Sequence, residues 1–535
     1  MAELITNPTI AAKPTPPDGA LRLFVIIVPM TILIAAAVAS LIDLDGFFAF
    51  ANLLNDWILS TFSSLISWAV FGFVLTCIGV FVSPLGKVTI GGVGATRTLA
   101  PISWFSITLC TTIATGILFW AMAEPIFHLY TPGGEAREIA PLSAEAARFS
   151  LVTMFMNWTI SPYAIYTVAA LTFALAYHNL GKPYSVSGPF VALIGRPLPA
   201  PIASVLDAAI LLALIMGMAA SLGAGMLLLG GGLANLTGLT SGPVLLAVIA
   251  AAIGMVVLIS SLTGLLKGIR ILSLINTAVF FVFLAFILIF GPTREMVVQG
   301  AAASVSYTFE FVERSLFIGA ASQDGEWAKS WTTFYFAIWL AWAPVTAMFL
   351  GRIARGYTVR AFVLVNLILP ALFSVMWMSV FSVFAMQTDL TQNGILNDTL
   401  TAVGAEGVMF RALETLPLSA LMIPFVLSLS FVSYVTAADS NTEAISQLCK
   451  THDHAMTEKD ETEPTAPKLK MIWVVLLCVM AWIMVAFSGI DGVRMLSNVG
   501  GLPALFVVLG LQVCLIRMVF QADRLNQPGG AISKT

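Results

Sequence analysis

The chain has 535 residues, of which 59% are hydrophobic and only 10% are charged. Soluble globular domains carry about 25% charged residues, so this composition predicts a polytopic membrane protein. A formal net charge of −3 is too small to indicate a nucleic acid or any other strongly charged partner.

Apolar segments long enough to cross a bilayer, which takes about 20 residues, follow one another along the chain. Twelve of them lie near residues 21–41, 63–82, 102–123, 149–177, 202–229, 243–262, 272–291, 330–350, 361–386, 419–446, 469–489 and 501–522. We therefore predict an all-α integral membrane protein with 12 transmembrane helices. A polar, Pro-rich tail over residues 1–20 precedes them, and a short tail over residues 523–535 follows.

Basic residues indicate the orientation. If the N-terminus lies in the cytoplasm, 18 of the 25 lysines and arginines fall on the cytoplasmic side. Because cytoplasmic loops carry an excess of these residues, we predict a multi-pass protein of the inner cell membrane with both termini in the cytoplasm. Residues 292–329 then form an outer loop, whose 305–318 portion is amphipathic enough to lie on the membrane surface.

Two features are predicted on the cytoplasmic side. Residues 451–470 are rich in charge and proline, which predicts a solvated linker. We expect its His452 and His454 to be solvated rather than to form a pH sensor or a metal site, because no cysteine or structural context accompanies them. Asp207, near the cytoplasmic end of the fifth segment, predicts a helix cap or a salt bridge rather than a substrate contact.

Sequence motifs for catalysis are missing from the chain. No HExxH, GxSxG or GxxxxGK[ST] pattern occurs, and the Gly-rich run GGVGATRT at 91–98 lacks the phosphate-binding lysine. We therefore predict no enzyme activity and no cofactor.

The third segment is polar where a simple span is apolar. Residues 110–116, CTTIATG, concentrate small and hydroxyl side chains in mid-membrane, and Glu124-Pro125 follows them. The tenth segment repeats the pattern over 433–440, SYVTAADS, and adds a carboxylate. Such residues are costly in lipid and are expected to face a cavity or another helix. Small residues also serve ordinary helix packing, so both interpretations stay open.

The fourth segment places aromatic residues beside a helix-breaking proline. Trp158, Tyr163 and Tyr166 cover about 140° of a helix face. Pro162 removes a backbone donor in mid-span. The cluster lies well inside the apolar run, which favours a pocket wall over an interfacial belt.

The eighth segment carries a second aromatic stripe. Trp331, Tyr335, Trp339 and Trp342 fall within an arc of about 80°. The stripe is typical of packing or of an interfacial belt, but indole faces also bind quaternary ammonium cations. The segment runs into three arginines that we interpret as topological anchors: Arg352, Arg355 and Arg360.

Several segments together resemble the betaine/choline/carnitine transporter family. They are GILFWAMAEP (116–125), NWTISPYAIYTVAALTFALAY (157–177), MAASLGAG (218–225), FYFAIWLAWAPVTAMFLGRIARGYTVRAF (334–362) and YVTAADS (434–440). The resemblance covers nearly all of residues 21–522. It implies a LeuT-like fold built from two inverted five-helix repeats. The first repeat comprises helices 3–7 over 102–291, and the second comprises helices 8–12 over 330–522. Two extra helices over 21–101 precede both repeats. It also implies a homotrimer with the surface helix of the outer loop in the contact.

The resemblance also implies an aromatic box for the substrate. The box maps to Trp158, Tyr163, Tyr166 and Trp339, with Trp342 on the cytoplasmic exit side. Methylated onium groups donate no N–H hydrogen bonds, so aromatic faces are their natural partners. Tyr163 stands where the family commonly has a second tryptophan, so the preferred substrate can differ from glycine betaine.

For the coupling ion, the resemblance implies a sodium site. It maps to the carbonyl groups of Cys110, Ile113 and Ser433 and the hydroxyl of Thr436. Ala437 replaces one further hydroxyl residue of the family pattern. Sodium-independent antiporters of the family carry an arginine on helix 7, whose place here is taken by Asn276.

These features predict a secondary active importer of a quaternary ammonium or sulfonium compound, such as betaine, choline, carnitine or dimethylsulfoniopropionate, coupled to sodium. Two alternatives remain open at this point. One is a proton-coupled or exchange transporter of the same substrates, and the other is an onium sensor that does not transport.

Overall fold

The computed structural model describes residues 21–113, 116–133, 139–182, 185–196, 198–263, 269–318, 324–450 and 467–526. Within these ranges the regular structure is helical, and extended pairing is limited to two isolated bridges, Leu21 with Lys450 and Thr89 with Thr358. The N-terminal tail, the linker histidines His452 and His454 and the last nine residues lie outside the described part of the chain.

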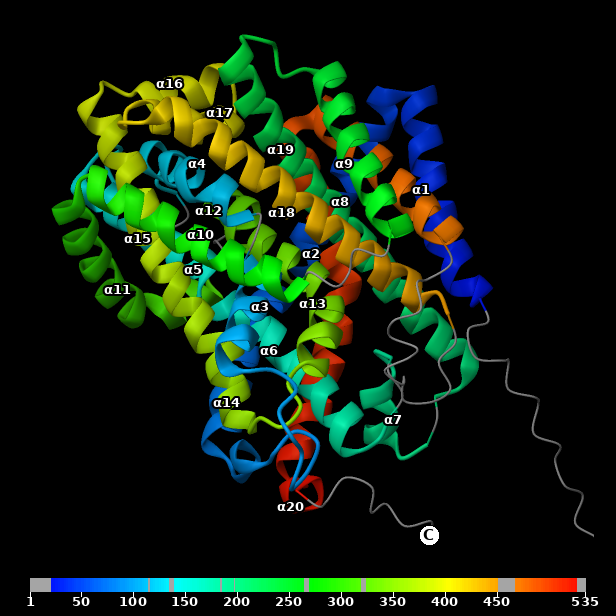
Figure 1. Cartoon of the computed structure of the whole chain (residues 1–535). Helices are drawn as coiled ribbons and strands as arrows, with labels where there is room; N and C mark the ends of the chain where they lie inside the picture. The colour runs from blue at the N-terminus through cyan, green and yellow to red at the C-terminus, as the bar shows by residue number, and fades with distance from the viewer. Residues whose placement is uncertain are drawn as a thin grey trace, which may run out of the picture.

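Helices follow one another along the described chain (Figure 1). Those of the first half are α1 (Leu23–Ile42), α2 (Leu44–Val82), η1 (Pro84–Lys87), α3 (Pro101–Ile113), α4 (Gly116–Tyr130), α5 (Ala144–Trp158), α6 (Ile160–Ala174), η2 (Leu175–Asn179), α7 (Gly188–Ile194), α8 (Ala200–Thr237), α9 (Pro243–Thr263) and α10 (Ile269–Phe290). Those of the second half are α11 (Thr293–Leu316), α12 (Asp324–Ala328), η4 (Lys329–Thr333), α13 (Phe334–Arg352), α14 (Val359–Val363), η5 (Leu364–Ile368), α15 (Leu369–Thr391), α16 (Ile395–Ala402), α17 (Ala405–Glu414), α18 (Ser419–Leu448), α19 (Pro467–Val519) and α20 (Ala522–Leu525).

Seven of the described helical stretches are long and apolar enough to cross a membrane by themselves. They are Leu23–Ile42, Leu44–Val82, Ala144–Asn179, Ala200–Thr237, Val359–Thr391, Ser419–Ser446 and Lys468–Val519. Three bent helix pairs raise the number to ten if each pair forms one span. The predicted class, an all-helical membrane protein, is confirmed at this level.

Several spans are broken rather than straight. α3 and α4 meet at 55°, and α13 bends by 52° where Pro344 interrupts its backbone hydrogen bonding. In α19 the break lies at Gly489, whose φ of 54° and ψ of −132° are outside the helical region and suit a residue without a Cβ. The two spans expected over 469–489 and 501–522 lie on the two sides of this break, and the orange and red halves of α19 diverge from a common corner in Figure 1.

α13 lies at the centre of the bundle, packed against α6, α8 and α19. The approach to α19 is close because small residues face each other there. A Cβ placed on Gly501 of α19 would lie 2.6 Å from the carbonyl oxygen of Ala337 on α13. Trp331 of η4 and Tyr335 and Trp339 of α13 are all buried, so the aromatic stripe lies inside the protein rather than against lipid.

The two ends of the bundle carry different elements. α16 and α17 lie at one end, whereas α7, α14 and α20 lie at the other (Figure 1). Arg22, just before α1, forms a 2.6 Å salt bridge with the buried Asp207 of α8. The prediction of a salt bridge at Asp207 is thus confirmed.

The amphipathic helix before α13 is longer than expected. The sequence predicted it over 305–318, but α11 runs from Thr293 to Leu316 and leaves α10 at an angle of 112°. Glu310 joins it to α5 by accepting a hydrogen bond from Arg148 at 2.8 Å, and it also accepts one from Arg314 of the same helix at 2.7 Å. The rest of α11 exposes a row of large apolar side chains: Val297, Val298, Val305, Phe309 and Val312.

Candidate functional site

Four of the five predicted substrate-contact residues meet in the interior. The ring centroid of Trp339 lies 5.5 Å from that of Trp158, 6.1 Å from that of Tyr163 and 5.5 Å from that of Tyr166. The interplanar angles are 86°, 54° and 73°, so the rings form steep walls around Trp339 instead of a parallel stack. All four side chains are buried. We call these four residues the box.

A break between α5 and α6 shapes one side of the box. Thr159 has φ −120° and ψ −111°, which ends α5 at Trp158 and starts α6 at Ile160. The break precedes Pro162, because a proline ring clashes with the carbonyl four residues earlier and its nitrogen has no hydrogen to donate. Trp158 thus closes α5, while Tyr163 and Tyr166 belong to α6.

The break also supplies a hydrogen-bond acceptor. The carbonyl oxygens of a last helical turn lack regular intrahelical partners. Here the Asn157 carbonyl accepts a 3.0 Å hydrogen bond from the indole N–H of Trp339 on α13. The two tryptophans of the box are therefore held at the same helix end.

A fully buried carboxylate joins the box to its surroundings. Glu124 of α4 accepts from the Asn157 side-chain amide at 2.7 Å, from the Trp158 indole at 3.0 Å and from the Tyr335 hydroxyl. The Nε2 atom of His128, one turn further along α4, lies 3.4 Å from the same carboxylate. Glu124 therefore fixes the orientation of one box wall through charge-assisted hydrogen bonds.

Sequence reasoning noted Glu124 but assigned it no role. The sequence does indicate that Glu124 is important, because a carboxylate inside an apolar span is rare and usually functional. What the sequence did not show is that donors from α5 and α13 converge on this one side chain.

The fifth predicted residue, Trp342, lies apart from the box. It is half-buried one turn further along α13, next to Gly217 of α8, where a Cβ would lie 3.4 Å from its Cδ1 atom. No ring contact joins Trp342 to the box among the described residues.

Gly116 allows α4 to approach the box. A Cβ at Gly116 would lie 3.0 Å from the Cη2 atom of Trp158, closer than ordinary van der Waals contact. Any larger residue here must push the indole ring, so the box depends on a glycine at the start of α4.

The four residues predicted to bind sodium lie on two helices with different neighbours. Cys110 and Ile113 belong to α3, which packs against α10 and η5, whereas Ser433 and Thr436 belong to α18, which packs against α8, α9 and α19. The Cys110 sulfur lies 3.4 Å from the Thr277 hydroxyl of α10. Among the described residues no group of three His, Cys, Asp or Glu side chains is placed to hold a metal ion. The sodium site therefore stays a prediction.

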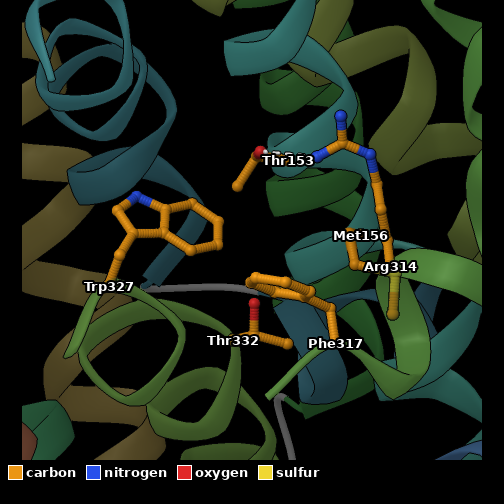
Figure 2. A pocket seen from close by; sticks show the side chains of 6 residues that line it. All are labelled: Thr153, Met156, Arg314, Phe317, Trp327 and Thr332. Atoms are coloured by element: carbon orange, nitrogen blue, oxygen red, sulfur yellow. Dashed lines mark hydrogen bonds between the residues drawn. The ribbon is translucent and has the colours of Figure 1, made fainter. Parts of the chain in front are cut away.

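A separate hollow lies between α5, the end of α11, α12 and η4. Figure 2 shows its lining residues: Thr153, Met156, Arg314, Phe317, Trp327 and Thr332. The guanidinium of Arg314 donates to the Thr153 hydroxyl at 3.5 Å on one side of it. Glu310 pairs with Arg314 at 2.7 Å and balances its charge, and the hollow has two aromatic side chains where the box has four.

Comparison with known proteins gives a match over nearly the whole chain. The BCCT family, described as betaine/carnitine/choline family transporter, matches residues 24–524. The chain is 28% identical over 466 residues to a glycine betaine transporter of Bacillus subtilis, which covers 85% of this chain and 88% of that protein. It is 26% identical over 502 residues to a probable glycine betaine transporter of Desulfitobacterium hafniense, with 92% and 97% covered. It is 27% identical over 477 residues to a glycine betaine/proline/choline/ectoine transporter of Vibrio parahaemolyticus, with 87% and 81% covered.

Proposed function

Because the chain belongs to the betaine/carnitine/choline family of transporters, we propose that it imports a quaternary ammonium or sulfonium compound by secondary active transport. Family membership makes it a transporter and not an enzyme. The observation that supports this substrate class is the box, in which three buried rings lie around the buried ring of Trp339. Betaine, choline, carnitine and dimethylsulfoniopropionate all present the methylated cation that such a site favours.

The chemistry of the box suits a cation without hydrogen-bond donors. Aromatic faces attract a cation within about 6 Å of the ring centroid. The two indole N–H groups are already bonded, to Glu124 and to the Asn157 carbonyl, which leaves ring faces for the substrate. An N–H bonded to a carboxylate enriches the ring in electron density, so Glu124 strengthens the attraction at Trp158.

A screen of ligands tests this proposal directly. A ligand that binds the native state raises its apparent stability, so glycine betaine, choline, carnitine or dimethylsulfoniopropionate should raise the melting temperature of the purified protein. Ectoine and proline, which lack a methylated cation of this kind, serve as comparison solutes. Stabilisation by ectoine or proline alone would contradict the onium assignment.

Crowding the box is expected to weaken transport without unfolding the protein. Overpacking costs about 1–3 kcal/mol, so Gly116→Val should raise the KM for the substrate by about tenfold. Gly79→Ala on α2 is the matched control, because a Cβ there meets no atom within 4 Å. The KM is measured by uptake of the radiolabelled substrate into proteoliposomes, and an unchanged KM for Gly116→Val would show that the box does not depend on a glycine at this position.

For the driving ion, we assign coupling to sodium through one site formed by Cys110, Ile113, Ser433 and Thr436. The predicted ligand of Ser433 is its carbonyl group, and its buried hydroxyl, which has no hydrogen-bond partner among the described residues, offers a further oxygen at the same residue. Replacing sodium by potassium at constant pH should then abolish accumulation of the substrate.

Proton coupling is the second candidate, and the buried pair Glu124 and His128 favours it. Carboxylate and imidazole groups at membrane depth form proton relays in other transporters. Accumulation that persists in potassium but follows an imposed pH gradient would select this candidate over sodium.

The architecture that we propose has 12 transmembrane helices in two inverted repeats over 102–291 and 330–522, assembled as a homotrimer in the inner cell membrane. The exposed apolar row of α11 supports the assembly, because large exposed apolar patches mark interfaces with proteins or lipid. Replacing Phe309, which is 84% exposed, by aspartate should therefore convert trimers to monomers. The number of subunits is measured by light scattering after size-exclusion chromatography. Val403→Asp, between α16 and α17, is the control. A Phe309→Asp protein that is still trimeric would rule out this contact.

A further inference from the structure

A tyrosine of the amphipathic helix α11 reaches the helix break beside the box. Tyr307 is buried, although α11 exposes a row of apolar side chains elsewhere. Its hydroxyl oxygen lies 2.9 Å from that of Thr159, the residue between α5 and α6. The backbone of Ile160, the first residue of α6, hydrogen-bonds to the same hydroxyl. One side chain of α11 therefore contacts both residues at which the chain leaves α5 and enters α6.

The break creates a need for this hydroxyl. The first N–H groups of a helix have no acceptor within that helix, and a side chain at the N-cap position often supplies one. Thr159 stands at the N-cap position of α6 but makes no such capping bond. Its hydroxyl is fully buried and donates instead to the Phe155 carbonyl in the last turn of α5, at 2.6 Å. The acceptor at the start of α6 thus comes from another helix, through Tyr307.

Contacts on both sides of Tyr307 fix it against α5. Arg148 of α5 donates to the Ser306 hydroxyl at 3.2 Å and to the Glu310 carboxylate at 2.8 Å. The ring centroid of Tyr307 also lies 6.0 Å from that of Phe155, in an edge-to-face arrangement. The position of the hydroxyl at the break is therefore set by several contacts of α11 with α5.

The break in turn sets the relative position of the box walls. Trp158 directly precedes Thr159, whereas the two tyrosines of the box follow it on α6. Glu124 holds the Trp158 indole at 3.0 Å, and the Asn157 carbonyl accepts from the Trp339 indole at 3.0 Å. A change in the backbone angles at Thr159 would turn the α5 wall relative to the α6 wall. Cation–π attraction requires each ring within about 6 Å of the cation, so such a turn weakens binding.

We propose that Tyr307 is a positioning residue of the box: its hydroxyl holds the α5–α6 break in the geometry in which Trp158 faces the other three rings. This inference rests on the proposed function, because it assumes that the box binds the substrate. Tyr307 touches no member of the box and acts through Thr159 and Ile160. The alternative is that its hydroxyl only anchors α11 to the bundle.

The variant Tyr307→Phe tests the role of the hydroxyl while keeping the ring. It leaves buried polar groups at the break without their partner, so the KM for the onium substrate should rise by about tenfold with a smaller change in kcat. Tyr357→Phe is the matched control, since Tyr357 is also buried and its hydroxyl donates to the Leu99 carbonyl at 2.7 Å. The control should keep its KM. An unchanged KM for Tyr307→Phe overturns the inference.

The partner of Tyr307 gives an independent test. Thr159→Val removes the hydroxyl at nearly constant size and should raise the KM by a similar factor, whereas Thr159→Ser keeps the hydroxyl and should stay near the unmodified value. The double variant Tyr307→Phe, Thr159→Val should be no worse than either single change, because residues of one hydrogen-bond network are not additive. Effects that multiply in the double variant would show that the two residues act separately and would overturn the inference.

Amide hydrogen exchange needs no substrate and separates the two roles of Tyr307. Tyr307→Phe should raise exchange severalfold in the peptide that contains Ile160, because the break opens more often. Faster exchange in α11 alone would show an anchor for that helix and overturn the inference. Failure of the proposed function differs from both outcomes, since it shows as absence of substrate accumulation by the unmodified transporter.

Discussion

Replacing Trp339 by alanine is expected to reduce uptake of the onium substrate by at least about a hundredfold, the largest effect of any single change in the box. The substitution removes the ring that contacts the other three members and its hydrogen bond to the Asn157 carbonyl. Cation–π attraction alone contributes up to about 2 kcal/mol per desolvated ring, and the collapse of the remaining walls adds to the loss. Trp339→Phe keeps a ring face and should retain measurable uptake.

The control must separate binding from folding, because truncating a buried tryptophan costs about 3–5 kcal/mol of stability anywhere in a core. Trp473 of α19 is equally buried and has no described ring contact with the box. Trp473→Ala should therefore lower the melting temperature while the folded fraction keeps its substrate affinity. Normal uptake by Trp339→Ala would remove the box assignment.

Replacing Glu124 by glutamine is expected to be the second largest effect. The amide keeps the size of the side chain but offers one acceptor oxygen and one donor group where three donors now converge, from Asn157, Trp158 and Tyr335. A buried donor left without its acceptor costs about 1–3 kcal/mol, which corresponds to about tenfold to hundredfold in affinity if the Trp158 wall turns away. The effect should appear chiefly in the KM for the substrate.

Asp389 provides the matched control for Glu124. It is also fully buried, but its carboxylate accepts hydrogen bonds from the backbone N–H groups of Leu396 and Asn397 at the start of α16 and from no described residue of the box. Asp389→Asn should lower thermal stability and leave the KM unchanged. If Glu124→Gln behaves in the same way, Glu124 is a structural residue and does not position Trp158.

The helical membrane class could be predicted from the sequence for a physical reason, and four of the residues predicted to contact the substrate lie together in the structure. Apolar runs of about 20 residues are typical of membrane-spanning helices. Pro162 indicates the helix break that separates Trp158 from Tyr163. The family resemblance then brought helix 4 and helix 8 together, which periodicity within one helix does not do. The structure places these residues around Trp339, while their role in binding the substrate stays a proposal.

Other features depend on contacts between distant segments and were not accessible from local patterns. Glu124 stood out as a carboxylate in an apolar helix, but its donors come from residues 33 to 211 positions away. Arg494 of α19, whose guanidinium carbon lies 4.8 Å from the ring centroid of Trp331 of η4, joins two helices across the bundle in the same way. The length of α11 was underestimated because its apolar row begins at Val297, before the strongly amphipathic part.

Uptake by proteoliposomes that contain the purified transporter tests the central claim most directly. Radiolabelled glycine betaine, choline, carnitine and dimethylsulfoniopropionate are offered in turn under an inward sodium gradient, under an inward proton gradient and against internal substrate. The account predicts saturable accumulation of at least one of the four, lost in Trp339→Ala. Failure of all four to accumulate under every gradient would contradict it.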